Sequence, residues 1–101
     1  NEAIAAVNLV RKRADASLYV GAGGSDLKDF IYTERCRELF GEGHRYFDLI
    51  RTRRILNSQW TMAPMNLDQY TRGAWTWPLD QSAREYNPHI VLNEYWTTTG
   101  R

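Results

Sequence analysis

Apolar positions at the start of the chain recur with the period of a helix. Between Glu2 and Ala14 the apolar residues return every three or four positions, at Ala3, Ile4, Val7, Val10 and Ala14. This spacing places them on one helix face, and the basic run Arg11, Lys12, Arg13 suits the negative end of the helix dipole. The pattern predicts an amphipathic helix over about residues 2–14.

Two more helices are expected on either side of a glycine pair. Three glycines between positions 21 and 24 indicate a loop that closes on Ser25 and Asp26 as the N-cap of a second helix, over about residues 26–40. Gly41 and Gly43 can end this helix, because glycine adopts the left-handed conformation at little cost. A third helix is predicted over about residues 44–56.

The expected second helix is apolar on more than one side. At about 100° per residue, Leu27 and Ile31 share a face with three glutamates, while the opposite side carries Tyr32, Cys36, Leu39 and Phe40. Such a helix is buried on several sides. A chain of 101 residues supplies few neighbours for it, so we expect this chain to be a fragment of a longer protein.

The chain loses helical periodicity after Asn57. Trp60, Pro64, Gly73 and Pro78 indicate irregular structure, and we expect residues 57–101 to be mostly irregular. A short helical turn is predicted over residues 82–86, and the stretch HIVLNEYW is predicted to be extended.

Composition excludes several classes of function. A net charge of +1, with acids and bases interleaved, gives no basic surface for nucleic acid and no field toward a membrane. No stretch has the ~20 apolar residues that cross a bilayer. Cys36, His44 and His89 are too few and too scattered for a disulfide framework or a metal site, so neither a metal nor another cofactor is predicted.

Charged residues of the second and third helices predict a structural ion-pair network. Carboxylates on a partly apolar face need cations, because an unpaired buried charge costs several kcal/mol, and arginine binds carboxylates with two parallel hydrogen bonds. The predicted network consists of Glu34, Arg35, Arg37, Glu38, Glu42, Arg45, Asp48 and Arg51.

Glu34 and Glu38 also allow a catalytic interpretation. The two carboxylates of a glycosidase lie roughly 5–9.5 Å apart, and side chains one helical turn apart can reach the lower end of that range. Surrounding arginines would hold both carboxylates ionised and leave no proton donor. The residues therefore favour the structural network over catalysis.

Trp75 and Trp77 are the candidate ligand-binding residues. If extended, this segment would present both rings on one face, where they could stack on a pyranose ring. Core burial is the commoner fate of tryptophan, and the same two alternatives apply to Trp60, Tyr70 and Trp96.

The residues from Glu34 to Arg51 carry a resemblance to a known family. The run ER-x-REL-x-x-EG-x-R-x-x-DL-x-R matches at eleven of eighteen positions. With the first helix before it and WPLDQSAREYNPHIVLNEYW after it, the chain resembles the C-terminal region of the SusD/RagB family.

The resemblance implies a mainly α protein with tetratricopeptide-like helix pairs and long irregular loops. It also implies an outer-membrane lipoprotein on the extracellular face, anchored through a lipidated cysteine upstream of this chain. Family members bind glycans, or in some cases peptides, and deliver them to a SusC-like TonB-dependent transporter without acting as enzymes. The alternatives left open are a carbohydrate hydrolase using Glu34 and Glu38, and a free-standing helical interaction module.

Overall fold

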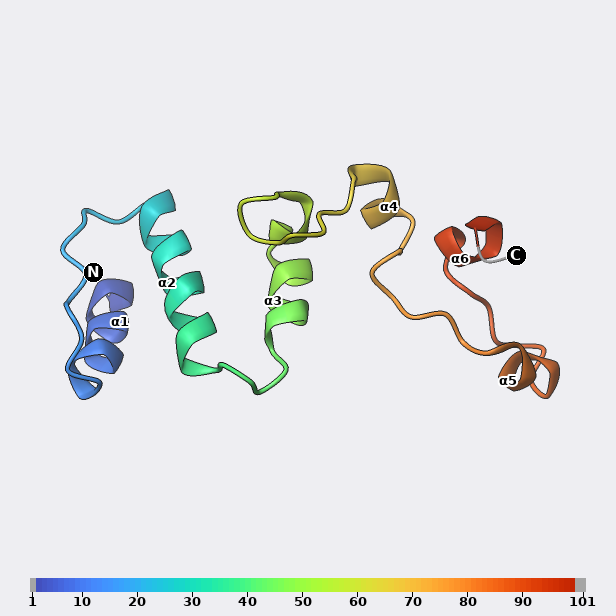
Figure 1. The fold of residues 1–101 in the computed structure, drawn as a ribbon, viewed down its shortest axis with the longest axis horizontal. Coiled ribbons are helices and arrows are strands. Elements are labelled where there is room, and N and C mark those ends of the chain that lie inside the picture. Colours follow the sequence, from blue (N-terminus) through green and yellow to red (C-terminus); the bar gives the residue numbers. More distant parts are fainter. Residues whose placement is uncertain (1, 100–101) are drawn as a thin grey trace. The chain divides into compact units, whose positions relative to one another are not determined.

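Every regular element of this protein is a helix over residues 2–99, which are the residues that the computed structural model describes (Figure 1). The mainly α class predicted from the sequence is therefore confirmed. The helices are α1 (Glu2–Arg13), α2 (Ser25–Glu38), α3 (Arg45–Arg51), the 3-10 helix η1 (Arg54–Leu56), α4 (Leu67–Thr71), α5 (Gln81–Glu85) and α6 (Glu94–Thr99). The chain divides into two compact units, one ending at Arg45 and the other beginning at Tyr46.

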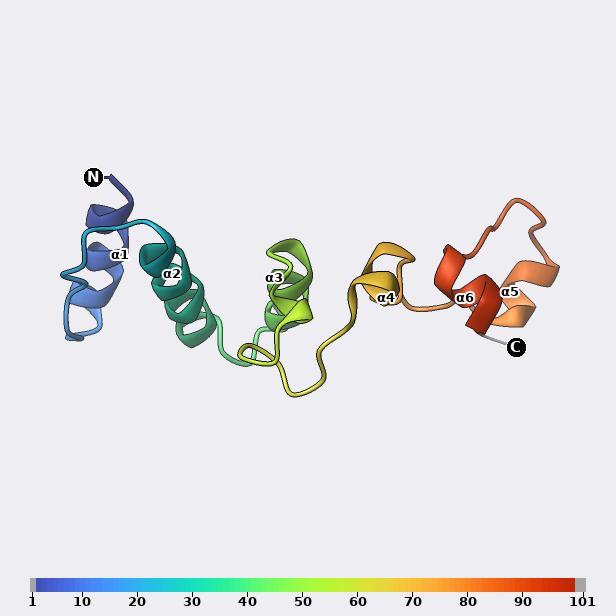
Figure 2. The same cartoon turned by 90° about the horizontal axis from the view of Figure 1, so that it is seen from above.

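In the first unit α1 and α2 lie side by side and run in the same direction (Figures 1 and 2). The connection between the two helices runs back along α1, where the Asn8 side-chain amide forms two hydrogen bonds with the Tyr19 backbone. Asn8 Nδ2 donates to the Tyr19 carbonyl at 3.0 Å, and the Tyr19 backbone N–H donates to Asn8 Oδ1 at 2.7 Å. Because the two helices are parallel, their C-terminal turns lie beside each other at the same end of the pair.

A small apolar core joins the two helices of the first unit. Val7 of α1 is buried, as are Leu27 and Tyr32 of α2. The Tyr19 ring packs against Phe30 with 4.8 Å between the ring centroids. The Phe30 ring also lies under the Arg11 guanidinium. This cation-π contact covers one edge of the core.

The ends of α2 differ slightly from the prediction. The helix begins at Ser25 and ends at Glu38, two residues earlier than expected. The N-cap is Gly24, with φ 76°, rather than Ser25 or Asp26, and no side chain caps the first turn. Gly41 and Gly43 have φ values of 77° and 80°, the left-handed conformation expected of glycines that follow a helix.

The third predicted helix is broken in the structure. Only α3 and η1 are helical in the expected range 44–56, and Thr52 and Arg53 separate them. The Thr52 backbone N–H and hydroxyl both donate to the Asp48 carbonyl, at 3.1 and 2.7 Å, so the last helical hydrogen bond of α3 is kept. Arg53 then takes a left-handed conformation with φ 57°, so the prediction of one continuous helix was wrong.

The rest of the second unit contains short helices separated by irregular segments. Residues between η1 and α4 are irregular, as expected, and α5 falls within one residue of the predicted turn. The prediction of an extended HIVLNEYW segment was wrong, because α6 begins at Glu94. The Asn93 carbonyl accepts from the backbone N–H groups of Trp96 and Thr97 and starts the helix.

Candidate functional site

Side chains of α3 and of residues 75–77 form an apolar pocket of about 500 Å³ in the second unit. Its lining consists of Tyr46, Phe47, Ile50, Arg51, Trp75, Thr76 and Trp77. We call it the Trp77 pocket. A concave apolar surface with few polar groups is the usual form of a small-ligand site.

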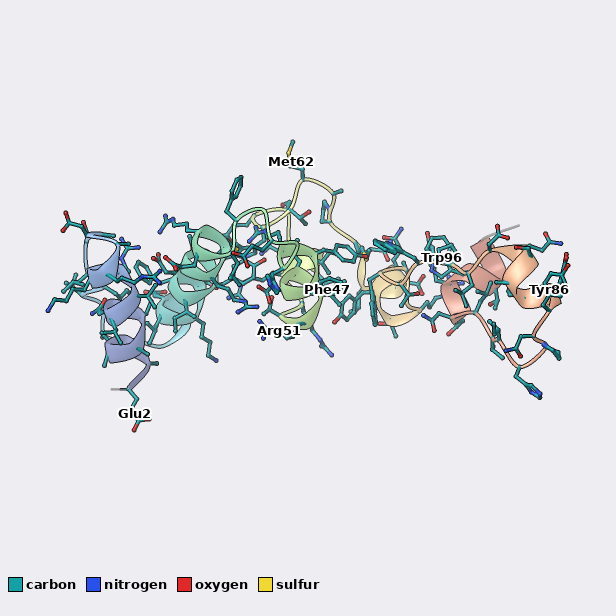
Figure 3. All side chains as sticks on the ribbon, turned by 90° about the horizontal axis from the view of Figure 1, so that it is seen from below. Glu2, Phe47, Arg51, Met62, Tyr86 and Trp96 are labelled. Carbon is teal, nitrogen blue, oxygen red and sulfur yellow. The ribbon has the colours of Figure 1, made fainter. Side chains whose placement is uncertain are left out.

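Helix α3 supplies one wall of the pocket. Phe47 and Arg51 stand one turn apart on this helix (Figure 3), so both side chains lie along the same face. The Tyr46 and Phe47 rings meet edge to face, with centroids 6.0 Å apart. Leu49 is buried on the other side of the helix and anchors this wall to the core.

Hydrogen bonds from aromatic residues hold the opposite wall in place. Trp75 Nε1 donates to the Tyr70 carbonyl at 3.1 Å, and the Tyr46 hydroxyl donates to the Trp75 carbonyl at 2.5 Å. Tyr70 in turn donates to the Ile50 carbonyl at 2.9 Å. Burial raises the pKa of Tyr46 above its ordinary value, so its hydroxyl stays protonated and keeps donating at neutral pH.

Trp77 is the exposed member of the pocket. Its side chain is 83% exposed, and Phe47 beside it is 67% exposed. Trp75 is half-buried. Residues 72–75 form a turn and not a strand, so the two rings do not share a strand face. The turn nevertheless brings both rings into one pocket.

The other aromatic candidates serve as structural contacts. Trp96 Nε1 donates to the Thr76 carbonyl at 2.7 Å, and the Trp60 ring lies 5.1 Å from the Arg54 guanidinium. Tyr70 bridges α4 and α3 through its hydroxyl. The sequence could have indicated this role, because tyrosine and tryptophan are large apolar groups that carry one polar atom.

Glu34 pairs with Arg37, a predicted partner, and with Arg11, which the sequence did not suggest. Its carboxylate lies 2.5 Å from Arg11 Nη1 and 3.3 Å from Arg37 Nη1. Glu38, one turn later, pairs with Arg13. The signal for Arg11 and Arg13 was the basic end of the first helix, which was attributed to the helix dipole alone.

The remaining residues of the predicted network lie in other surroundings. Asp48 is buried and pairs with Arg51 at 3.1 Å, the i, i+3 contact that the spacing suggested. The Arg45 guanidinium lies 4.8 Å from the Tyr32 ring, and its Nη1 is 2.5 Å from Cys36 Sγ. Arg35 and Glu42 are exposed. Among these eight residues the structure shows the pairs Glu34–Arg37 and Asp48–Arg51, and a single network of all eight stays a prediction.

Known proteins identify the family of this chain. The sequence profile of the SusD family matches residues 1–96. This chain belongs to the SusD family. A SusD homologue from Bacteroides thetaiotaomicron, known from a crystal structure, is 46% identical and superposes with a TM-score of 0.86 over 95% of this chain and 20% of its own. A SusD-like protein of Formosa agariphila is 35% identical over 91% of this chain and 19% of its own length.

The SusD-family chain spans about a fifth of the length of these relatives. The family resemblance noted in the sequence is confirmed by all three matches. Within residues 2–99, no group of histidine, cysteine and acidic side chains could hold a metal ion, and no helix is long and apolar enough to cross a membrane.

Proposed function

We propose that this chain is the C-terminal part of a longer glycan-binding protein of the bacterial cell surface. Membership of the SusD family supports the proposal, as does the short span of the chain relative to its relatives. The full-length protein would be a lipoprotein, anchored through an upstream cysteine on the extracellular face of the outer membrane. It would bind oligosaccharides, or in some cases peptides.

The observation that carries the proposal is the exposed ring of Trp77 beside Phe47. A flat indole matches the C–H-bearing face of a pyranose and loses little side-chain entropy on binding. Trp75 also lines the pocket, and its hydrogen bond to the Tyr70 carbonyl holds its ring in place. Trp75 and Trp77 are therefore the proposed ligand-binding residues, Trp77 by direct stacking and Trp75 as its support.

Most of this chain, and the first unit above all, would serve as structural scaffold. Polar contacts between α1 and α2 tie the two helices of the first unit together, and its pocket of about 510 Å³ after α2 is lined by Phe40 but by no tryptophan or tyrosine. Family members hand their ligand to a SusC-like TonB-dependent transporter. We propose the same partner for the full-length protein.

A carbohydrate hydrolase using Glu34 and Glu38 is less well supported than a binding protein. Both carboxylates are paired with arginines of α1, and a nearby guanidinium favours the ionised form of a carboxyl group. Neither residue lines the Trp77 pocket. We propose that the protein is not an enzyme and needs no cofactor.

Binding and co-purification together test the proposed function. Full-length protein would be titrated calorimetrically with a panel of neutral and acidic oligosaccharides, and detergent extracts of its native membranes would be analysed for a co-purifying TonB-dependent transporter. We expect saturable binding without release of reducing ends, together with the transporter. Absence of both binding and transporter contradicts the proposal, and reducing-end release that is lost in Glu34→Gln would favour the hydrolase.

A further inference from the structure

The Trp77 pocket has few hydrogen-bonding groups left for a ligand. The Tyr46 hydroxyl and Trp75 Nε1 donate to backbone carbonyls. The Thr76 hydroxyl donates to the Gly73 carbonyl at 2.7 Å and accepts from Asn93 Nδ2 at 2.6 Å. No carboxylate or side-chain amide lines the pocket, so its side chains offer a sugar hydroxyl no acceptor stronger than the hydroxyl oxygens of Tyr46 and Thr76.

Arg51 is the one charged side chain in the lining. It is 65% exposed, and its Nη2 donates to Asp48 Oδ1 while Asp48 itself is buried. A guanidinium has five N–H donors and no acceptor, so this ion pair leaves donors of Arg51 directed away from Asp48. The exposed Trp77 adds an indole N–H, which is also only a donor.

Such a lining suits an anion better than a hydroxyl group. A neutral sugar hydroxyl can only form ordinary hydrogen bonds with these groups, and such bonds add little because water offers the same. A carboxylate or sulfate only accepts, and arginine binds it with short charge-assisted hydrogen bonds. Asp48 holds Arg51 in place and offsets part of its positive charge. The preference for an anionic ligand therefore rests more on the geometry of the Arg51 donors than on net charge.

We propose that the Trp77 pocket selects an acidic sugar unit, with the C–H face of the ring on Trp77 and the carboxylate or sulfate group on Arg51. This inference rests on the proposed function, because it names the class of glycan that the same site takes.

Matched pairs of ligands and variants test the inference. The probes are tetramers of galacturonic acid and mannuronic acid and a chondroitin sulfate tetramer, each compared with its carboxyl-reduced or desulfated form. Full-length protein is compared with Arg51→Gln, with Arg51→Lys and with Arg53→Gln, which removes the same charge from an exposed residue outside the pocket. Thermal melting checks that each variant is folded.

We expect at least one acidic tetramer to bind about tenfold more tightly than its neutral form, since hydrogen bonds to charged groups are stronger than those between neutral groups. Arg51→Gln should abolish this preference, Arg51→Lys should restore part of it, and Arg53→Gln should leave it intact. Equal binding of the paired forms, or a preference unchanged in Arg51→Gln, overturns the inference. If no tetramer binds, the inference also fails, and binding of other, neutral oligosaccharides then shows whether the proposed function survives it.

Discussion

Two glutamates one turn apart on α2 occupy different environments. The Glu34 side chain is 8% exposed and its partner Arg11 is 12% exposed, whereas Glu38 and Arg13 are 33% and 70% exposed. A buried ion pair is costly to break, because the partner left behind is a desolvated charge. An exposed pair is screened by water and contributes little. Only the first pair should therefore matter for stability.

Neutralising each carboxylate in turn tests this difference. Glu34→Gln should lower the free energy of unfolding by about 3–5 kcal/mol, and Glu38→Gln by less than about 1 kcal/mol. Denaturant unfolding of the full-length protein measures both, with Glu38→Gln as the control for the loss of one negative charge on the same helix. Equal losses in the two variants would show that burial does not distinguish the pairs.

At the scale of elements, the turn between α4 and the pocket depends on one glycine. Gly73 is buried with φ 86°, and a Cβ there would lie 3.0 Å from the Asn93 side chain. Asn93 holds Thr76 through its amide, and the Tyr95 backbone N–H donates to the Arg72 carbonyl at 2.9 Å. This turn therefore joins α6 to the wall that carries Trp75 and Trp77.

Replacing this glycine should loosen that wall. Gly73→Ala carries a backbone cost of about 1 kcal/mol for a left-handed alanine and also displaces Asn93. Gly41→Ala is the control, because Gly41 has φ 77° but nothing within 4 Å of an added Cβ. Thermal melting should show the larger loss for Gly73→Ala, and a loss no larger than that of Gly41→Ala would mean that the Asn93 contact is unimportant.

The elements also show how far the sequence could predict the fold. Strongly periodic apolar residues and left-handed glycines located α1 and α2 to within a few residues. The break after α3 comes at Arg53, whose left-handed conformation is not registered by the periodicity of apolar residues. In α6 the residues Tyr95, Trp96 and Thr97 favour strands, and contacts with Arg72 and Thr76 override that preference.

The candidate site was predictable only in part. Trp75 and Trp77 were singled out for their ring type, but no sequence pattern indicated that Tyr46 and Tyr70 would hold Trp75. Arg51 was assigned to an ion-pair network, and Phe47 was not among the candidate site residues. They reach the pocket because α3 packs against a turn about 25 residues later in the chain, a contact that local patterns do not encode.

At the scale of the whole molecule, apolar side chains are more often exposed than buried. Five apolar residues form the cores of the two units, whereas Val20, Phe40, Met62, Tyr86 and Val91, all outside the Trp77 pocket, are each more than 80% exposed among the described residues. Met62 and Tyr86 extend away from neighbouring side chains (Figure 3). Such a surface suits a part of a larger protein, in line with relatives about five times longer.

The most direct test of the account is the affinity of Trp77→Ala for an oligosaccharide that the full-length protein binds. We predict about five- to tenfold weaker binding by calorimetry, because an aromatic stacking contact is worth roughly 1 kcal/mol or more, with an unchanged melting temperature because the ring is exposed. Tyr86→Ala, an equally exposed aromatic outside the pocket, should bind like the wild type. Wild-type affinity in Trp77→Ala would contradict the assignment of glycan binding to this pocket.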